Sequence, residues 1–172
     1  MRLIDYINQG GAIMYILLAL NIIGIAIMIT KFLLLSKESK NCADTAATIA
    51  GRVKSETQST DIHALIEVSK QNTAEYISDI ERGLNTVKII AAISPLLGLL
   101  GTVLGVLIAF QVMSQTGLNN PASFAQGISL ALITTVGGMI VAIPHFIGHN
   151  YLLGMVDRLE AELEKRILNH VL

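Results

Sequence analysis

The chain has 172 residues, 52% of them hydrophobic, and its 12 basic and 13 acidic side chains leave a formal net charge of −1. This balance excludes the basic excess by which proteins bind nucleic acids, and the single cysteine, Cys42, excludes an intrachain disulfide. The charges are unevenly distributed, because residues 6–30 and 89–156 contain no Asp, Glu, Lys or Arg. A water-soluble domain carries charges over its whole surface, so we expect an integral membrane protein.

The N-terminal segment, residues 1–11, leads into a first predicted membrane span, residues 12–35. A helix needs about 20 apolar residues to cross a hydrocarbon core of about 30 Å, and this stretch is long enough. It is longer than the apolar region of a signal peptide, no small-residue cleavage site follows it, and most of the nearby positive charges come after it. We therefore expect a retained span.

Two further spans are predicted at residues 89–113 and 123–148, joined by a turn-rich connection at residues 114–122. Backbone amides in lipid must be paired internally, and long continuous apolar runs differ from the alternating pattern of barrel strands. All three spans are therefore expected to be helices. The connection is short, so the second and third spans should form an antiparallel hairpin.

Positive charges predict the orientation. Seven Lys and Arg lie in residues 36–88 and three in residues 149–172, whereas residues 114–122 carry none. Cytoplasmic segments retain Lys and Arg. The predicted fold is therefore all-α, a multi-pass membrane protein with three transmembrane helices, the N-terminus outside, the C-terminus inside, and long cytoplasmic helical extensions.

The cytoplasmic region at residues 36–88 is expected to be helical, with a loop near residues 58–60. Asp61 is placed to cap a helix, and apolar residues recur after it with a period close to 3.6. The apolar positions are Ile62, Leu65, Ile66, Ile77, Ile80, Leu84 and Val87. No proline interrupts this segment, so the helix is predicted to continue unbroken into the second span, with Gly83 as its weak point.

The cytoplasmic tail at residues 149–172 carries a second apolar stripe. Its members are Leu152, Val156, Leu159, Leu163, Ile167 and Val171. Glu162 and Arg166 have the i,i+4 spacing of a helical ion pair. The stripe needs a partner, which is either the helix after Asp61 in the same chain or the same region of neighbouring subunits. We expect both.

Small residues recur at a spacing of three or four along the second and third spans. They are Gly98, Gly101 and Gly105 in the second span and Gly127, Ala131 and Gly138 in the third. In lipid, close packing replaces the hydrophobic effect, and small residues let helices approach one another. We therefore assign these positions to helix packing.

Three threonines, Thr102, Thr134 and Thr135, lie near the middle of these spans. Each hydroxyl either bonds back to a carbonyl of its own helix, as is common for Thr, or lines a narrow polar path. Proton pumps and transporters carry ionisable groups within the membrane, and these spans contain no Asp, Glu, Lys or Arg. Either the chain is not a proton device, or the titrating group comes from another chain.

The second and third spans also contain two prolines and end near two histidines. Pro95 and Pro144 each free a backbone carbonyl and predict a kink. His145 and His149 lie at the inner end of the third span, and two imidazoles make an incomplete zinc site, so we expect interfacial histidines. The sequence has no nucleophile–base set, phosphate loop or Cys/His array, so we predict no enzymatic activity, no metal and no cofactor.

Two stretches of the sequence resemble one family. SPLLGLLGTVLG, residues 94–105, is similar to the second-span motif of the ExbB/TolQ/MotA proton-channel family. GISLALITTVGGMIVAIPHFIGHN, residues 127–150, is similar to the third-span motif of the same family. The motifs occur in the family's order on the family's hairpin, and the three-span topology extends the resemblance to the whole chain.

The resemblance implies a function. ExbB-type members form a homo-oligomeric ring, a pentamer, in the bacterial inner membrane. The ring encloses the membrane helix of a partner, ExbD, whose aspartate carries the proton. By position, Thr102 and Thr135 match the family's lumen threonines, and Thr134 lies beside them. Such a stator couples the proton-motive force to TonB, which energises outer-membrane uptake of iron complexes and cobalamin.

Size favours some members over others. MotA-type stators have four spans and a larger charged domain, so three spans favour ExbB or TolQ. TolQ, which works with TolR and TolA in envelope integrity and division, stays an alternative, as does a non-conducting membrane scaffold. ExbB proteins often carry a glutamate where this chain has Leu130, so the resemblance implies no acidic lumen contact from this position.

Overall fold

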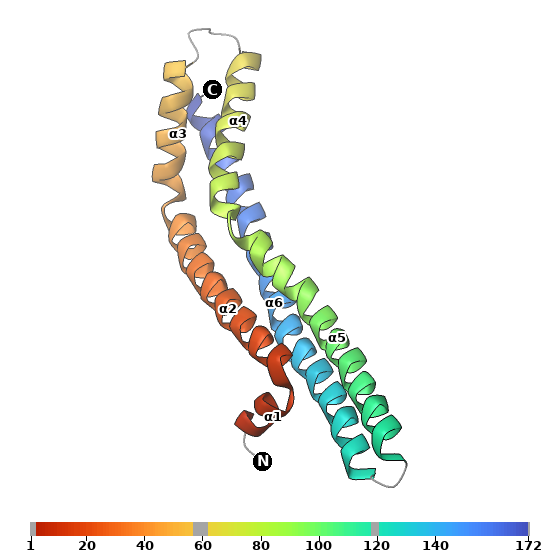
Figure 1. Ribbon diagram of the computed structural model, residues 1–172. Helices are drawn as coiled ribbons and strands as arrows, with labels where there is room; N and C mark the ends of the chain where they lie inside the picture. The colour runs from red at the N-terminus through yellow and green to blue at the C-terminus, as the bar shows by residue number, and fades with distance from the viewer. Residues whose placement is uncertain (1–2, 57–61, 118–120, 172) are drawn as a thin grey trace. The chain divides into compact units, whose positions relative to one another are not determined.

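The computed structural model describes residues 3–56, 62–117 and 121–171. All regular elements within these ranges are α-helices, which confirms the all-α prediction (Figure 1). In chain order they are α1 (Leu3–Gln9), α2 (Gly11–Lys40), α3 (Cys42–Glu56), α4 (Ile62–Glu81), α5 (Leu84–Thr116) and α6 (Pro121–Val171). The short α1 was not predicted from the sequence.

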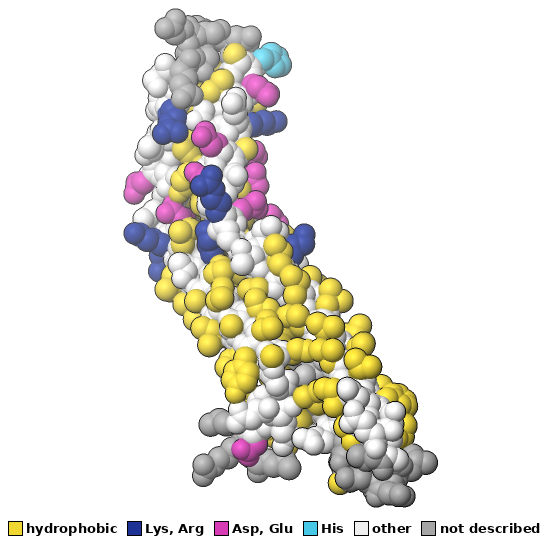
Figure 2. All heavy atoms as spheres, viewed as in Figure 1, with side chains coloured by type: hydrophobic (Ala, Val, Ile, Leu, Met, Phe, Trp, Pro, Cys, Tyr) yellow, Lys and Arg dark blue, Asp and Glu magenta, His cyan; other side chains and the backbone are white. Residues whose placement is uncertain are grey.

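The helices form two compact units. The apolar unit comprises Met1–Ala26 and Thr86–Ile147, and the charged unit comprises Ile27–Asn85 and Gly148–Leu172. Figure 2 shows hydrophobic side chains covering the visible face of the apolar unit, whereas Lys, Arg, Asp and Glu side chains are scattered over the charged unit. This division follows the uneven distribution of charge along the sequence.

Three of the described helices are long and apolar enough to cross a membrane. They contain the stretches Gly11–Lys40, Leu84–Gln115 and Phe124–His170. Each stretch includes nearly all of one span predicted from the sequence, and each helix continues beyond it into polar residues. The chain therefore has the helices of a multi-pass membrane protein.

The prediction of one unbroken helix from Asp61 into the second span is wrong. Helix α4 ends at Glu81 and α5 begins at Leu84, and between them Gly83 has φ +93°. This left-handed conformation is accessible to glycine because it has no Cβ. The predicted cap at Asp61 and the predicted loop at residues 58–60 lie outside the described residues.

Lys31 stabilises this break. Its Nζ donates a hydrogen bond to the carbonyl of Ile80 at 2.8 Å. The last carbonyls of a helix lack partners within the helix, and a cation there also interacts favourably with the helix dipole. A side chain of α2 thus terminates α4, a long-range contact that the local sequence does not reveal.

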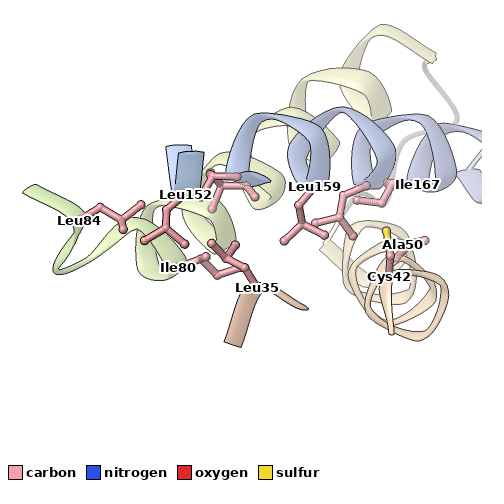
Figure 3. Close-up of a cluster of buried hydrophobic side chains, with 12 residues drawn as sticks. Leu35, Cys42, Ala50, Ile80, Leu84, Leu152, Leu159 and Ile167 are labelled. Carbon is pink, nitrogen blue, oxygen red and sulfur yellow. The ribbon is translucent and has the colours of Figure 1, made fainter. Parts of the chain in front are cut away.

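The core of the charged unit is built around the apolar stripe of α6. Leu152, Val156, Leu159, Leu163 and Ile167 are all buried, as the sequence predicted. Figure 3 shows stripe members pointing toward side chains contributed by other helices of the unit. These partners include Leu35 of α2, Cys42, Ala46 and Ala50 of α3, and Ile77 and Ile80 of α4. An intrachain partner for the stripe is therefore confirmed.

Two further predictions for the charged unit have different outcomes. Arg166 Nε donates to Glu162 Oε1 at 2.6 Å, which confirms the i,i+4 pair. Ile62, by contrast, is 56% exposed, so the apolar stripe of α4 packs through its second half rather than along its whole length. Val171, the last member of the predicted α6 stripe, has a side chain that the structure does not describe.

Candidate functional site

Helices α5 and α6 of the apolar unit are in backbone contact along a seam of small residues. A Cβ atom added to Gly105 would lie 2.6 Å from the carbonyl oxygen of Gly127 and 2.8 Å from the amide nitrogen of Ala131. A Cβ atom on Gly98 would lie 2.9 Å from the carbonyl oxygen of Thr134. Real Cβ atoms do not approach backbone so closely, so any larger residue would force the helices apart.

The other small residues of the seam also lie in close contact with the facing helix. Gly138 faces the backbone of Gly98, Gly101 faces the side chain of Thr134, and Gly127 faces Ala109. All six small residues assigned to packing from the sequence lie in this seam, which therefore joins the second and third predicted spans within one chain.

Thr134 lies inside the seam. Its side chain is fully buried, and its hydroxyl donates toward the carbonyls of Ala131 at 3.0 Å and Leu130 at 3.1 Å. Because the Cα of Gly101 covers it, the side chain has no open face within the chain. The structure therefore places Thr134 in helix packing rather than on an open edge.

Thr102 and Thr135 lie together on one edge of the hairpin, which we call the threonine edge. The hydroxyl of Thr135 donates across the seam toward the carbonyl of Gly98 at 3.3 Å and toward the carbonyl of Ala131 at 3.2 Å. In an α-helix the carbonyl of Gly98 also accepts the amide of Thr102, four residues later. Gly98 therefore places the two threonines within one helical turn of each other.

The threonine edge is open within the chain. Helix α2 packs on another side of the hairpin, where Leu17 clusters with Ile90 and Val141. At about 100° per residue, Ile90 and Val141 each lie about 120° around their helix from the threonine of that helix. The neighbours of the threonines, such as Val103 and Leu132, are 59% and 63% exposed, so the edge is a bare apolar surface with two hydroxyls.

The two hydroxyls differ in how firmly they are held. Thr102 Oγ1 donates to the carbonyl of Leu99 at 2.6 Å, a short bond, whereas both bonds of Thr135 exceed 3.1 Å. Each hydroxyl oxygen keeps lone pairs that accept from an outside donor. The Thr135 hydroxyl, held by two long bonds, also turns most easily to donate to an outside acceptor.

Leu130 lies away from the threonine edge. It lines an open groove of about 660 Å³ together with Gln9 of α1 and Val112 of α5. It is five residues from Thr135, about 140° around α6. A carboxylate at this position would therefore face the groove and not the threonines of the same chain.

The two span prolines lie on exposed faces of their helices. Both α5 and α6 continue as helices through them. Next to Pro95, the buried Ser94 hydroxyl donates to the carbonyl of Ile90 at 2.7 Å. The kinks at Pro95 and Pro144 stay predictions.

His145 is buried between helices, which was not predicted, and the expectation that it lies at the membrane interface stays a prediction. Its side chain is fully buried in the apolar unit, and its ring lies against Gly24 of α2. The signal was present in the sequence, since Thr134, Gly138 and Val141 precede it at the i, i+4, i+7, i+11 spacing of one helix face. Among the described residues, no group of three His, Cys, Asp or Glu is placed to hold a metal ion.

The charged unit contains the clearest electrostatic feature outside the spans. Tyr76 Oη of α4 donates to Glu38 Oε2 of α2 at 2.6 Å. Burial and this hydrogen bond raise the pKa of Tyr76 to about 12. Burial likewise raises the pKa of the Cys42 thiol, so this cysteine is an unreactive core residue.

The chain is similar to known membrane proteins. A family model described as the MotA/TolQ/ExbB proton channel family matches residues 37–165. Biopolymer transport protein exbB1 of Vibrio cholerae is 43% identical over 90 residues, which are 52% of this chain and 39% of that protein. The putative biopolymer transport protein ExbB homolog of Methanothermobacter thermautotrophicus is 42% identical over 82 residues, 47% of this chain and 28% of that protein.

A third relative covers more of its own length. Biopolymer transport protein ExbB of Aquifex aeolicus is 36% identical over 86 residues, 50% of this chain and 58% of that protein. In all three comparisons the chain spans less than two thirds of the relative. The matches therefore show similarity to part of each relative and not to its full length.

Proposed function

Since the chain belongs to the MotA/TolQ/ExbB proton channel family and is ExbB-like, we propose that it is a non-enzymatic subunit of a proton-channel stator in the bacterial inner membrane. Copies of the chain form a ring, a pentamer, with the N-terminus outside and the charged unit in the cytoplasm. The ring encloses the membrane helix of an ExbD-type partner and transmits the proton-motive force to TonB-dependent uptake.

The threonine edge carries this proposal. It presents two hydroxyls on an otherwise apolar and exposed surface, and the hairpin contains no Asp, Glu, Lys or Arg between residues 89 and 156. A proton path through lipid needs an ionisable group. In this proposal the group is a carboxylate of the partner, which faces the threonine edges of the ring.

Threonine suits both protonation states of such a carboxylate. A protonated carboxyl group donates to the free lone pairs of Thr102 and Thr135, whose own protons point toward helix carbonyls. A carboxylate instead needs a donor, and the weakly held hydroxyl of Thr135 turns to supply it. The edge thereby stabilises the group before and after proton release without adding a competing charge.

Substitutions of the threonines test the proposal. We expect Thr102→Val and Thr135→Val, which keep the side-chain shape, to lower proton flux by about tenfold or more, since each removes a hydrogen bond to a charged group. Flux is measured in liposomes containing the chain with its ExbD-type partner, and assembly is measured by native mass spectrometry. Pentamer assembly should be unchanged.

Thr134→Val is the matched control, because that threonine is fully buried in the seam. We expect its flux to stay within about twofold of wild type, since its hydroxyl bonds only carbonyls of its own helix. Wild-type flux in the Thr102 and Thr135 variants, or equal flux through the oligomer without any partner, would show that the proposal is wrong.

Two other functions make different predictions. A non-conducting scaffold would tolerate both threonine changes, and only seam changes such as Gly101→Leu would abolish its assembly. A TolQ-like subunit would conduct in the same way but co-purify with a TolR-type protein, and its loss would weaken the envelope rather than uptake. Co-purification from native membranes separates the ExbB-like from the TolQ-like role.

A further inference from the structure

One buried nitrogen of the apolar unit is left without a partner. His145 is fully buried, and its Nδ1 lies 2.7 Å from the carbonyl of Val141. A carbonyl only accepts, so Nδ1 carries the proton and Nε2 is a bare acceptor. Nε2 is buried and has no hydrogen-bond partner among the residues that the structure describes.

The bare nitrogen faces helix α2. A Cβ atom on Gly24 would overlap Nε2 and Cδ2 of the His145 ring, and it would also approach the Ile90 side chain at 3.1 Å. The ring therefore fits into a notch that exists because residue 24 is glycine. Neither of the two residues that this notch brings to the ring, Gly24 and Ile90, has a side-chain donor.

Docking of α2 therefore costs His145 a hydrogen bond. When α2 lies against the hairpin, Nε2 has no donor, and an unsatisfied buried acceptor is expensive. When α2 moves away, the nitrogen is free to meet water or a lipid headgroup. We propose that His145 makes the docking of α2 onto the α5–α6 hairpin reversible, so that α2 is the movable helix of the apolar unit.

The other contacts of the apolar unit also indicate a fixed α5–α6 seam and a movable α2. The α5–α6 seam is in backbone contact and its buried hydroxyls of Ser94 and Thr134 are all bonded. Helix α2 instead meets α6 through flexible side chains, such as Met14 over Gly137. A flexible side chain adjusts to a shift more easily than backbone packed on backbone, so motion is expected at α2 and not at the seam.

Amide hydrogen exchange of the full chain in lipid nanodiscs tests the proposal. Exchange of the amides of residues 18–26 requires their helical hydrogen bonds to open, which is easier when α2 is not packed on the hairpin, so the exchange rate rises with the population of the undocked state. We expect His145→Leu to slow exchange in this segment by about tenfold, because an apolar side chain of similar size removes the unsatisfied nitrogen. Gly24→Ala, which fills the notch, should speed it.

A neighbouring histidine provides the control. His149→Leu changes the same residue type one turn further along α6, where the side chain is only partly buried, and should leave exchange of residues 18–26 within about twofold of wild type. His145→Met serves as a second apolar variant in case leucine packs poorly.

The outcomes are distinct. Slower exchange in either apolar variant at position 145 supports the proposal. Exchange at or above the wild-type rate in both, or failure of both to fold, would mean that the imidazole holds α2 in place, and the proposal would be overturned. Proton flux is not part of this measurement, so the result is independent of the proposed channel function.

Discussion

The charged unit is held together by large aliphatic side chains, whereas the hairpin of the apolar unit is held by backbone contact. Around the α6 stripe, residues such as Leu159, Leu163 and Ile167 form a buried cluster with side chains from α2, α3, α4 and the start of α5. Along the α5–α6 seam the buried positions are glycine, alanine, serine and threonine, and the large residues point outward. Leu132 and Ile140, for example, are 63% and 65% exposed.

The difference follows from the surroundings that each unit is built for. In water, burying apolar area is favourable in itself, so large side chains in the core contribute most. In lipid, a leucine gains nothing from leaving an equally apolar solvent, and helices associate through close packing instead. Large side chains therefore stabilise the charged unit, and small residues stabilise the hairpin of the apolar unit.

Adding a side chain to the seam should have the largest effect. We expect Gly105→Leu to prevent the hairpin from forming, because even its Cβ would meet the backbone of Gly127 and Ala131, which cannot rotate away. Gly154→Leu, on α6 in the charged unit, places its Cβ where no atom lies within 4 Å and should assemble normally. Native mass spectrometry of both variants makes the measurement, and a stable Gly105→Leu oligomer would refute backbone contact as the organising feature.

Removing a side chain should matter most in the charged unit. Leu163 is fully buried, and we expect Leu163→Ala to lower the free energy of unfolding by about 2–5 kcal/mol, through lost burial and the cavity left behind. The control is Ile62→Ala, which removes a side chain that is 56% exposed and should change stability by less than about 0.5 kcal/mol. Thermal unfolding in detergent reports both values, and equal effects would contradict the assigned core.

The break at Gly83 should give a smaller effect. Gly83→Ala forces a Cβ into the left-handed region at φ +93°, which costs about 1–2 kcal/mol. Gly51→Ala, in the middle of α3 with nothing within 4 Å, should instead stabilise by about 0.5–1 kcal/mol. If both substitutions stabilised the protein in thermal unfolding, the break between α4 and α5 would not require a left-handed residue.

Sequence alone was informative where one physical property repeats along the chain. The three apolar helices follow from charge-free runs, and the α6 stripe follows from its 3.6 period. The sequence marked Gly83 as the weak point of one long helix but did not predict the break there, because a single glycine within a helical pattern is tolerated at about 1 kcal/mol. The contact that terminates α4, from Lys31 to the Ile80 carbonyl, joins residues 49 apart.

The candidate site was only partly predictable for a similar reason. The sequence identified three threonines but not which face of α6 meets α5, and this contact buries Thr134 while it leaves Thr135 at an edge. His145 was assigned to an interface because of its residue type. Its helical register, which places it on the same face as Thr134, Gly138 and Val141, was the signal for its burial between helices.

The smallest predicted effect concerns a polar contact of the charged unit, the bond from Tyr76 to Glu38. We expect Tyr76→Phe to destabilise the protein by about 1 kcal/mol at pH 7. Because the pKa of Tyr76 is raised to about 12, its stabilisation is complete below about pH 10, the ordinary tyrosine pKa. It is lost as the pH rises from 10 through 12.

Unfolding measured from pH 7 to 12 should therefore show the wild type converging on Tyr76→Phe only above pH 10. Tyr151→Phe is the control, since Tyr151 is 62% exposed and should follow the wild type throughout. A constant difference between wild type and Tyr76→Phe up to pH 12 would mean that the lost contact is packing of the ring and not the hydroxyl bond. This tyrosine would then stabilise the charged unit through the size of its ring, and the contrast with the apolar unit would be sharper still.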